Sequence, residues 1–238
     1  MTDPLHLGND VVDLRDPRVR GKAEDARFLE RVFTEGERET IVAAADPHHA
    51  LWARWAAKEA AFKAVSKLLG SPPVFHHPRF RVSLAREPGE DPGLRGEVRY
   101  GDLSLVVEVG STTDFVHGLA RAEAEDEGVE PVQRVVRAED VRAGGGEGGK
   151  AGWRDALRPS FSPAEWACVT HRVSALTRLG VRADLARGLG VEEERLQITC
   201  QDGPAGRRIP VVLLDGATLG ADLTLSHHGR YLAWAYLP

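Results

Sequence analysis

The apolar positions of the first half predict helices followed by strands. In the segment 49–70, apolar residues recur at helical spacing, and Gly70, Pro72 and Pro73 follow, so we expect a helix that ends there. A shorter helix is expected over 23–33. Alternating or short apolar runs bounded by polar residues predict strands, which lie at 5–14, 80–84, 96–101, 103–109 and 115–122.

The second half follows the same plan. Its pattern predicts one or two helices over 164–190 and then strands at 194–200, 208–214 and 223–237. Helices followed by antiparallel-type strands, twice over, indicate an α+β protein made of two modules. We find no close sequence repeat, so any symmetry between the modules would lie in the fold alone.

A glycine-rich segment separates the two halves. Residues 138–152 contain six glycines among charged side chains, a composition typical of a flexible connection. We therefore expect a first module over 1–125, a linker over 126–152 and a second module over 153–238.

Composition and charge narrow the classes of function. The formal net charge of −5 argues against a general nucleic-acid-binding protein. No run approaches the roughly 20 apolar residues of a membrane helix, and the N-terminus lacks the pattern of a secretory signal. The two cysteines, Cys168 and Cys200, do not form a CxxC pair, so we expect no zinc site or disulfide framework and a reducing cytoplasm.

One short segment is basic although the protein is acidic. In RDPRVRGK, only Asp16 opposes the cations Arg15, Arg18, Arg20 and Lys22. Such a strip is either a docking surface for an acidic partner or a solvated loop.

Asp10 is an unusual residue for a strand. It lies inside the run LGNDVVDL, two residues after Gly8, which would let another backbone approach closely. A carboxylate there must be paired, exposed at an edge or bound to a cation. Asp13 is expected to cap the following turn.

Glu59 and Lys63 are four residues apart and share a helix face. They form either a surface ion pair or part of a site. The spacing alone leaves both interpretations open.

Ser226, His227 and His228 interrupt the apolar run near the C-terminus, beside Gly229, which indicates a bulge or the approach of a ligand. No third metal ligand stands at a sensible spacing. The histidine therefore suits a phosphate better, with further donors available from Arg207 and Arg208.

The first half resembles the 4′-phosphopantetheinyl transferase superfamily, particularly its holo-acyl-carrier-protein synthases. Those proteins begin with a Gly-Ile-Asp-type strand, continue with a Phe…Arg…Thr…Glu segment and then carry a Trp/Phe-x-x-Lys-Glu-Ala…Lys helix. The matching residues are Gly8, Asn9 and Asp10; Phe28, Arg31, Thr34 and Glu37; and Trp55, Lys58, Glu59, Ala60 and Lys63.

The resemblance implies that Asp10 and Glu59 bind Mg²⁺ or Mn²⁺, and that Lys63 and Lys58 hold the pyrophosphate of coenzyme A. Larger members, of the surfactin-synthetase-activating type, often have a third acidic ligand two residues after the aspartate. Here that position is Val12, as in the small synthases, so water is expected to complete the metal's shell.

The second half is similar to the other module of those larger enzymes. Its LTLSHHG segment resembles their Ser-Leu-Ser-His-Ser-Gly motif, and its GRRIP stretch loosely resembles their Gly-Lys-Pro motif. In the family, that histidine contacts the 3′-phosphate of coenzyme A. The resemblance implies a coenzyme A-binding set of Ser226, His227, Arg207 and Arg208.

The order of the modules is reversed relative to the larger enzymes, as in a circular permutation. In the first half, Ser111 and Thr112 stand where the imidazole would be, and the second half lacks the Gly-x-Asp strand and the Lys-Glu helix. Because each module lacks what the other keeps, we expect two pseudo-symmetric modules that share one composite site within a monomer.

The resemblance implies transfer of 4′-phosphopantetheine from coenzyme A to a serine of an acidic apo-carrier protein, with Asp10, Glu59 and Lys63 as the catalytic residues. Glu59 and a metal-bound water are both possible bases. The first alternative is an inactive relative that binds coenzyme A or carrier protein. The second is a metal-dependent nuclease, which the acidic net charge and the absence of a Glu-x-Lys spacing disfavour.

Overall fold

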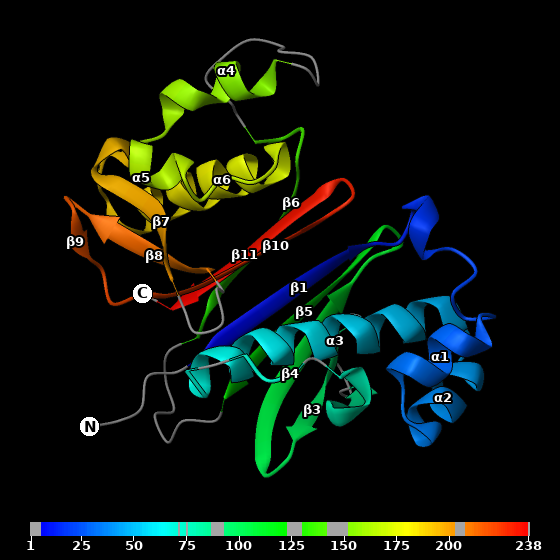
Figure 1. The fold of residues 1–238 in the computed structure, drawn as a ribbon. Helices are drawn as coiled ribbons and strands as arrows, with labels where there is room; N and C mark the ends of the chain where they lie inside the picture. The colour runs from blue at the N-terminus through cyan, green and yellow to red at the C-terminus, as the bar shows by residue number, and fades with distance from the viewer. Residues whose placement is uncertain are drawn as a thin grey trace. The chain divides into compact units, whose positions relative to one another are not determined.

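The computed structural model describes residues 6–70, 72–74, 76–86, 93–122, 130–141, 152–202 and 208–237. The chain divides into two compact units, Met1–Glu130 and Pro131–Pro238. Each unit mixes helices with antiparallel sheet, so the predicted α+β class is confirmed (Figure 1). None of the helices in the described ranges is long and apolar enough to cross a membrane.

The first unit is built on a five-stranded antiparallel sheet in the order β1-β5-β4-β3-β2. The strand predictions for this half are confirmed. The strands are β1 (Leu7–Asp13), β2 (Arg81–Arg86), β3 (Leu94–Tyr100), β4 (Leu103–Ser111) and β5 (Phe115–Ala122). Pairing of β1 with β5 brings the first strand of the unit beside the last, and Asp10 stands opposite Gly118.

Helix α3 (Pro47–Leu68) lies along one face of this sheet (Figure 1). Two glycines of the sheet allow unusually close packing. A Cβ atom at Gly8 would lie 2.0 Å from the carbonyl oxygen of Ala60, and one at Gly118 would lie 2.8 Å from that of Ala56. The strands therefore touch the helix backbone itself, which any side chain at these positions would prevent.

Two short helices precede α3. Asp25 accepts a hydrogen bond from the Phe28 amide and begins α1 (Ala26–Val32), within the predicted helix 23–33. Thr34 and Glu37 form a capping box that begins α2 (Glu35–Val42). The apolar pattern did not predict α2, because Glu37 and Ile41 are its only buried residues.

The second unit contains two three-stranded antiparallel sheets, ordered β10-β11-β6 and β7-β8-β9. Leu176, Leu185, Ile198 and Trp234 belong to its core. Its elements are β6 (Val132–Arg137), α4 (Trp153–Leu157), α5 (Pro163–Trp166), α6 (Arg172–Leu189), β7 (Leu196–Asp202), β8 (Arg208–Leu214), β9 (Ala217–Thr218), β10 (Asp222–His228) and β11 (Tyr231–Leu237).

Two details of this unit differ from the expectations. The run 223–237 is a hairpin with continuous register and a turn at Gly229, whose φ is 56°, so the suggested bulge is wrong. Residues 132–137, within the expected linker, form β6 and pair with β11. Their partner lies about a hundred residues later in the chain, so local composition could not reveal the pairing; residues 142–151 of the linker lie outside the described ranges.

Candidate functional site

Asp10 of β1 and Lys63 of α3 are in contact. The Lys63 Nζ atom lies 3.1 Å from Asp10 Oδ1 and donates a hydrogen bond to the Asn9 carbonyl oxygen at 2.6 Å. The Asp10 side chain is 15% exposed and the Lys63 side chain is 24% exposed. Packing of α3 on β1 therefore joins the first and third sequence motifs, and leaves both charged groups partly open to solvent.

Glu59 lies one helical turn before Lys63 and faces a different partner. Its Oε1 atom is 3.6 Å from His77 Nε2, and 22% of its side chain is exposed. Glu59 and Lys63 are thus each directed to another element. His77 belongs to a short 3₁₀ helix (His77–Arg79), and nothing in the sequence pattern pointed to it.

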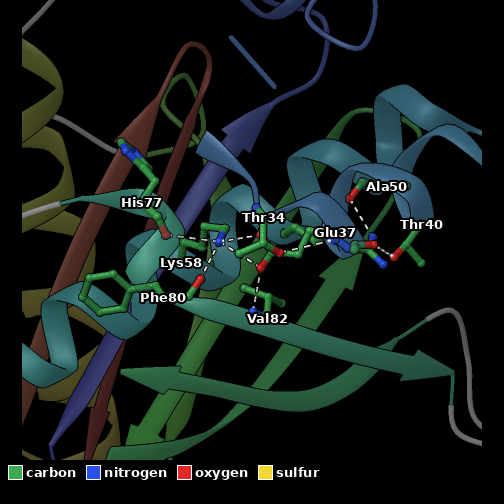
Figure 2. A network of polar contacts seen from close by, with 10 residues as sticks. Thr34, Glu37, Thr40, Ala50, Lys58, His77, Phe80 and Val82 are labelled. Atoms are coloured by element: carbon green, nitrogen blue, oxygen red, sulfur yellow. Dashed lines mark hydrogen bonds and ion pairs between the residues drawn. The ribbon is translucent and has the colours of Figure 1, made fainter. Parts of the chain in front are cut away.

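Lys58 is placed differently from the prediction. Its side chain is completely buried, and its Nζ atom donates to both Glu37 carboxylate oxygens at 2.9 Å, to the His77 carbonyl at 3.2 Å and to the Phe80 carbonyl (Figure 2). Burial lowers the pKa of Lys58, and Glu37 opposes this shift. Oxygen atoms of the protein surround the ammonium, and the contact of Lys58 with coenzyme A stays a prediction that these partners do not favour.

A buried polar pair lies beside Asp10 in sequence. Asn9 is completely buried, and its Nδ2 atom lies 3.4 Å from Nε2 of His117 on β5. Burial lowers the pKa of His117 to about 4, a shift that Asp10 opposes and Lys63 reinforces. The imidazole is therefore neutral at pH 7, with Nε2 as the acceptor for the asparagine amide. Sequence reasoning missed His117, which lies in an ordinary apolar strand.

The predicted metal ligands suit Mg²⁺ in their chemistry. Asp10 and Glu59 offer hard carboxylate oxygens from neighbouring elements. Across the described part of the chain, no group of three or more His, Cys, Asp or Glu side chains gathers to form a complete cage. Mg²⁺ does not need one, because it is usually bound through one or two carboxylates together with water and substrate phosphates.

The second unit carries the other predicted residues. Ser226 is buried on β10, and the next residue, His227, is exposed. Arg208 begins β8, is exposed, and donates a hydrogen bond to the Ala167 carbonyl. Arg207 lies outside the described residues.

Thr112, together with Ser111, is expected at the position in the first unit where the histidine motif has its imidazole. The Thr112 hydroxyl accepts hydrogen bonds from the amides of Asp114 and Phe115, at 3.1 and 3.2 Å. It therefore caps the turn between β4 and β5.

The basic strip is largely paired with acids. Arg15 contacts Asp114, Arg18 contacts Asp16 and Lys22 contacts Asp25. The fourth cation, Arg20, is exposed and donates to the Arg15 carbonyl at 3.5 Å. Asp13 accepts a hydrogen bond from the Arg15 amide at 3.0 Å, which confirms its predicted capping role.

Comparisons with known proteins find similarity to one family, and they agree with one another. Residues 6–120 match the model of the 4′-phosphopantetheinyl transferase superfamily. The holo-[acyl-carrier-protein] synthase of Chlamydia caviae is 35% identical over 65 residues, which are 27% of this chain and 53% of that protein. That of Azoarcus sp. is 37% identical over 70 residues, which are 29% and 56% of the two chains.

This chain thus spans about half the length of the curated relatives it matches. Among solved structures, the holo-[acyl-carrier-protein] synthase of Thermotoga maritima aligns with a TM-score of 0.34 and 21% identity. That alignment covers 54% of this chain and 68% of the other.

Proposed function

Through residues 6–120 this chain belongs to the 4′-phosphopantetheinyl transferase superfamily, and from this premise we propose that it transfers the phosphopantetheine arm of coenzyme A to a serine of an apo-carrier protein. The observation that carries the proposal is the contact between Lys63 and Asp10, with Glu59 one turn away on the same helix. All three residues lie within the matched segment.

In this proposal, Asp10 and Glu59 hold the metal ion and Lys63 faces the pyrophosphate. When bound, Mg²⁺ would supply positive charge to the phosphate oxygens during phosphoryl transfer. Two partly exposed carboxylates within one matched segment support their role as ligands. The partly exposed ammonium of Lys63, in contrast to that of Lys58, supports a role toward substrate.

The proposed reaction breaks one phosphorus–oxygen bond and forms another. The serine Oγ atom of the carrier bonds to the β-phosphorus of coenzyme A, and adenosine 3′,5′-bisphosphate leaves with the bridging oxygen. The hydroxyl proton passes to a base, either Glu59 or a water molecule at the site. Lys63 stabilises the negative charge that develops on the leaving side.

The direct test is incubation of the protein with coenzyme A, Mg²⁺ and an apo-acyl-carrier protein, followed by intact mass measurement of the carrier. We expect the carrier to gain the mass of one phosphopantetheine group, and the gain to disappear when a chelator removes the metal. A carrier that binds but stays unmodified would favour the inactive relative, and cleavage of nucleic acid under the same conditions would favour the nuclease.

The role proposed for the second unit has its own test. If His227 contacts the 3′-phosphate of coenzyme A, His227→Ala should weaken binding of coenzyme A. Dephospho-coenzyme A should lose the same binding energy in the wild type and lose nothing more in the variant, because the two changes remove one shared interaction. Additive losses would contradict the contact. The single composite site, the circular permutation and the monomeric state stay predictions.

A further inference from the structure

Three residues of α3 contact the same residue, His77, in the segment that follows the helix. Trp55, Lys58 and Glu59 stand at positions i, i+3 and i+4 and so share one helix face. The Trp55 ring lies 4.7 Å from the His77 imidazole, centroid to centroid, at 32° between planes. Lys58 donates to the His77 carbonyl, and Glu59 Oε1 lies 3.6 Å from its Nε2 atom. His77 thus meets a tilted ring contact, a backbone hydrogen bond and a carboxylate contact from one helix.

The location of His77 is fixed by the core of the unit. The buried ion pair of Lys58 and Glu37 binds the segment after α3 at three points: Lys58 donates to the carbonyls of His77 and Phe80, and Glu37 accepts the Val82 amide at 2.7 Å. Figure 2 shows the His77 carbonyl turned toward Lys58 and its imidazole pointing away from the ion pair. The ring is therefore held beside Glu59 by contacts that do not depend on Glu59.

In this arrangement, the two carboxylate oxygen atoms of Glu59 are available to different partners. Oε1 faces the imidazole, so Oε2 is the oxygen that the contact leaves for a cation. At 3.6 Å the His77 contact is longer than a hydrogen bond. Hydrogen bonds of catalytic groups are often long before ligands bind and shorten afterwards. Carboxylates that ligate metals are themselves usually held by such outer partners.

We propose that His77 is a positioning residue, which orients the Glu59 carboxylate for its cation through Nε2. This inference rests on the proposed function, in which Glu59 is a metal ligand. It also assigns work to the other members of the Trp-x-x-Lys-Glu motif: Trp55 and Lys58 act on Glu59 indirectly, by holding His77.

Two substitutions separate positioning from packing. His77→Phe keeps a ring against Trp55 and removes Nε2, whereas His77→Gln keeps an N–H donor and removes the ring. His76→Ala is the matched control, because His76 is the adjacent histidine and is exposed. If His77→Phe does not fold, His77→Asn repeats the test with an amide too short to reach Glu59. Thermal unfolding of each variant verifies the fold.

The main readout is the binding of Mn²⁺ alone, measured from the free ion by electron paramagnetic resonance. We expect His77→Phe to weaken Mn²⁺ binding by about tenfold or more, His77→Gln to restore most of the affinity, and His76→Ala to bind like the wild type. In the transfer assay, kcat should fall in His77→Phe while KM for coenzyme A changes little.

The reverse pattern would overturn the inference: normal Mn²⁺ binding by His77→Phe with weakened binding by His77→Gln makes His77 a packing residue. A wild type that binds no Mn²⁺ overturns it as well. Failure of the proposed function is distinguishable, because a wild type that transfers nothing but shows the expected order of Mn²⁺ affinities leaves the role of His77 intact.

Discussion

Lys58 and Lys63 lie five residues apart on α3, in opposite surroundings. Lys58 is completely buried against Glu37 and two backbone carbonyls, whereas the Lys63 side chain is 24% exposed and contacts Asp10 at the edge strand. Both belong to the same motif and carry the same charge. The comparison teaches that the surroundings of a lysine, and not its place in a motif, decide whether its charge is available to a ligand.

The largest effect that tests this comparison is on stability. Lys58→Ala leaves the Glu37 carboxylate buried without its cation, so we expect a loss of about 3–5 kcal/mol in the free energy of unfolding, measured with urea. Lys63→Ala is the control on the same helix and should cost less than about 1 kcal/mol, because the Lys63 pair is partly solvated. Equal losses in the two variants would break the comparison.

A double variant sharpens the same point. Lys58→Met combined with Glu37→Gln leaves neither charge uncompensated, so it should recover part of the stability that Lys58→Ala loses. Purely additive losses would mean that the two side chains stabilise the fold independently.

The next effect is on activity and concerns the two partly exposed carboxylates, Asp10 and Glu59. Asp10→Ala and Glu59→Ala should each lower kcat/KM about 10³-fold, which corresponds to about 4 kcal/mol of transition-state stabilisation. Glu30→Ala, which removes an exposed carboxylate of α1, should leave the rate unchanged. Near-normal turnover in a folded Asp10 or Glu59 variant would remove that residue from the metal site.

A third effect is the pH dependence of stability, which tests the buried contact between Asn9 of β1 and His117. The pKa of His117 is about 4 in the folded protein and 6.5 without burial, so the unfolded chain takes up a proton first as pH falls. The free energy of unfolding therefore does not depend on the titration of His117 above pH 6.5. Between pH 6.5 and 4 it falls by about 3 kcal/mol, because only the unfolded chain binds the proton readily.

Urea unfolding across this pH range measures the loss. His117→Asn removes the titrating group and keeps a polar partner for Asn9, so its stability should fall less steeply over the same window. Equal slopes in the variant and the wild type would mean that other groups account for the acid sensitivity.

The smallest effect concerns the basic strip. Three of its cations are paired with aspartates, so we expect only a modest role in docking an acidic carrier protein. Arg20→Glu should raise KM for the carrier severalfold at low salt, leave KM for coenzyme A unchanged, and lose its effect as salt rises. Equal changes in both KM values would place the strip away from the carrier.

The local elements were predictable because they depend on the period of apolar residues. Helical spacing predicted α3, and alternation predicted the five strands of the first unit. Gly8 was also interpreted correctly, since a glycine inside a strand indicates a close approach of another backbone. Among the elements that were missed, α2 has few buried residues and β6 takes its partner from a distant part of the chain.

The sequence by itself predicted the α+β class, the resemblance to the family and the candidate residues Asp10, Glu59 and Lys63, because motif spacing and apolar periodicity are local properties. Only the tertiary structure decided that Lys58 pairs with Glu37, that Lys63 meets Asp10, and that His77 stands beside Glu59. These contacts join residues from 18 to 53 positions apart. Burial and partners at such separations follow from how the elements pack, which no local pattern records.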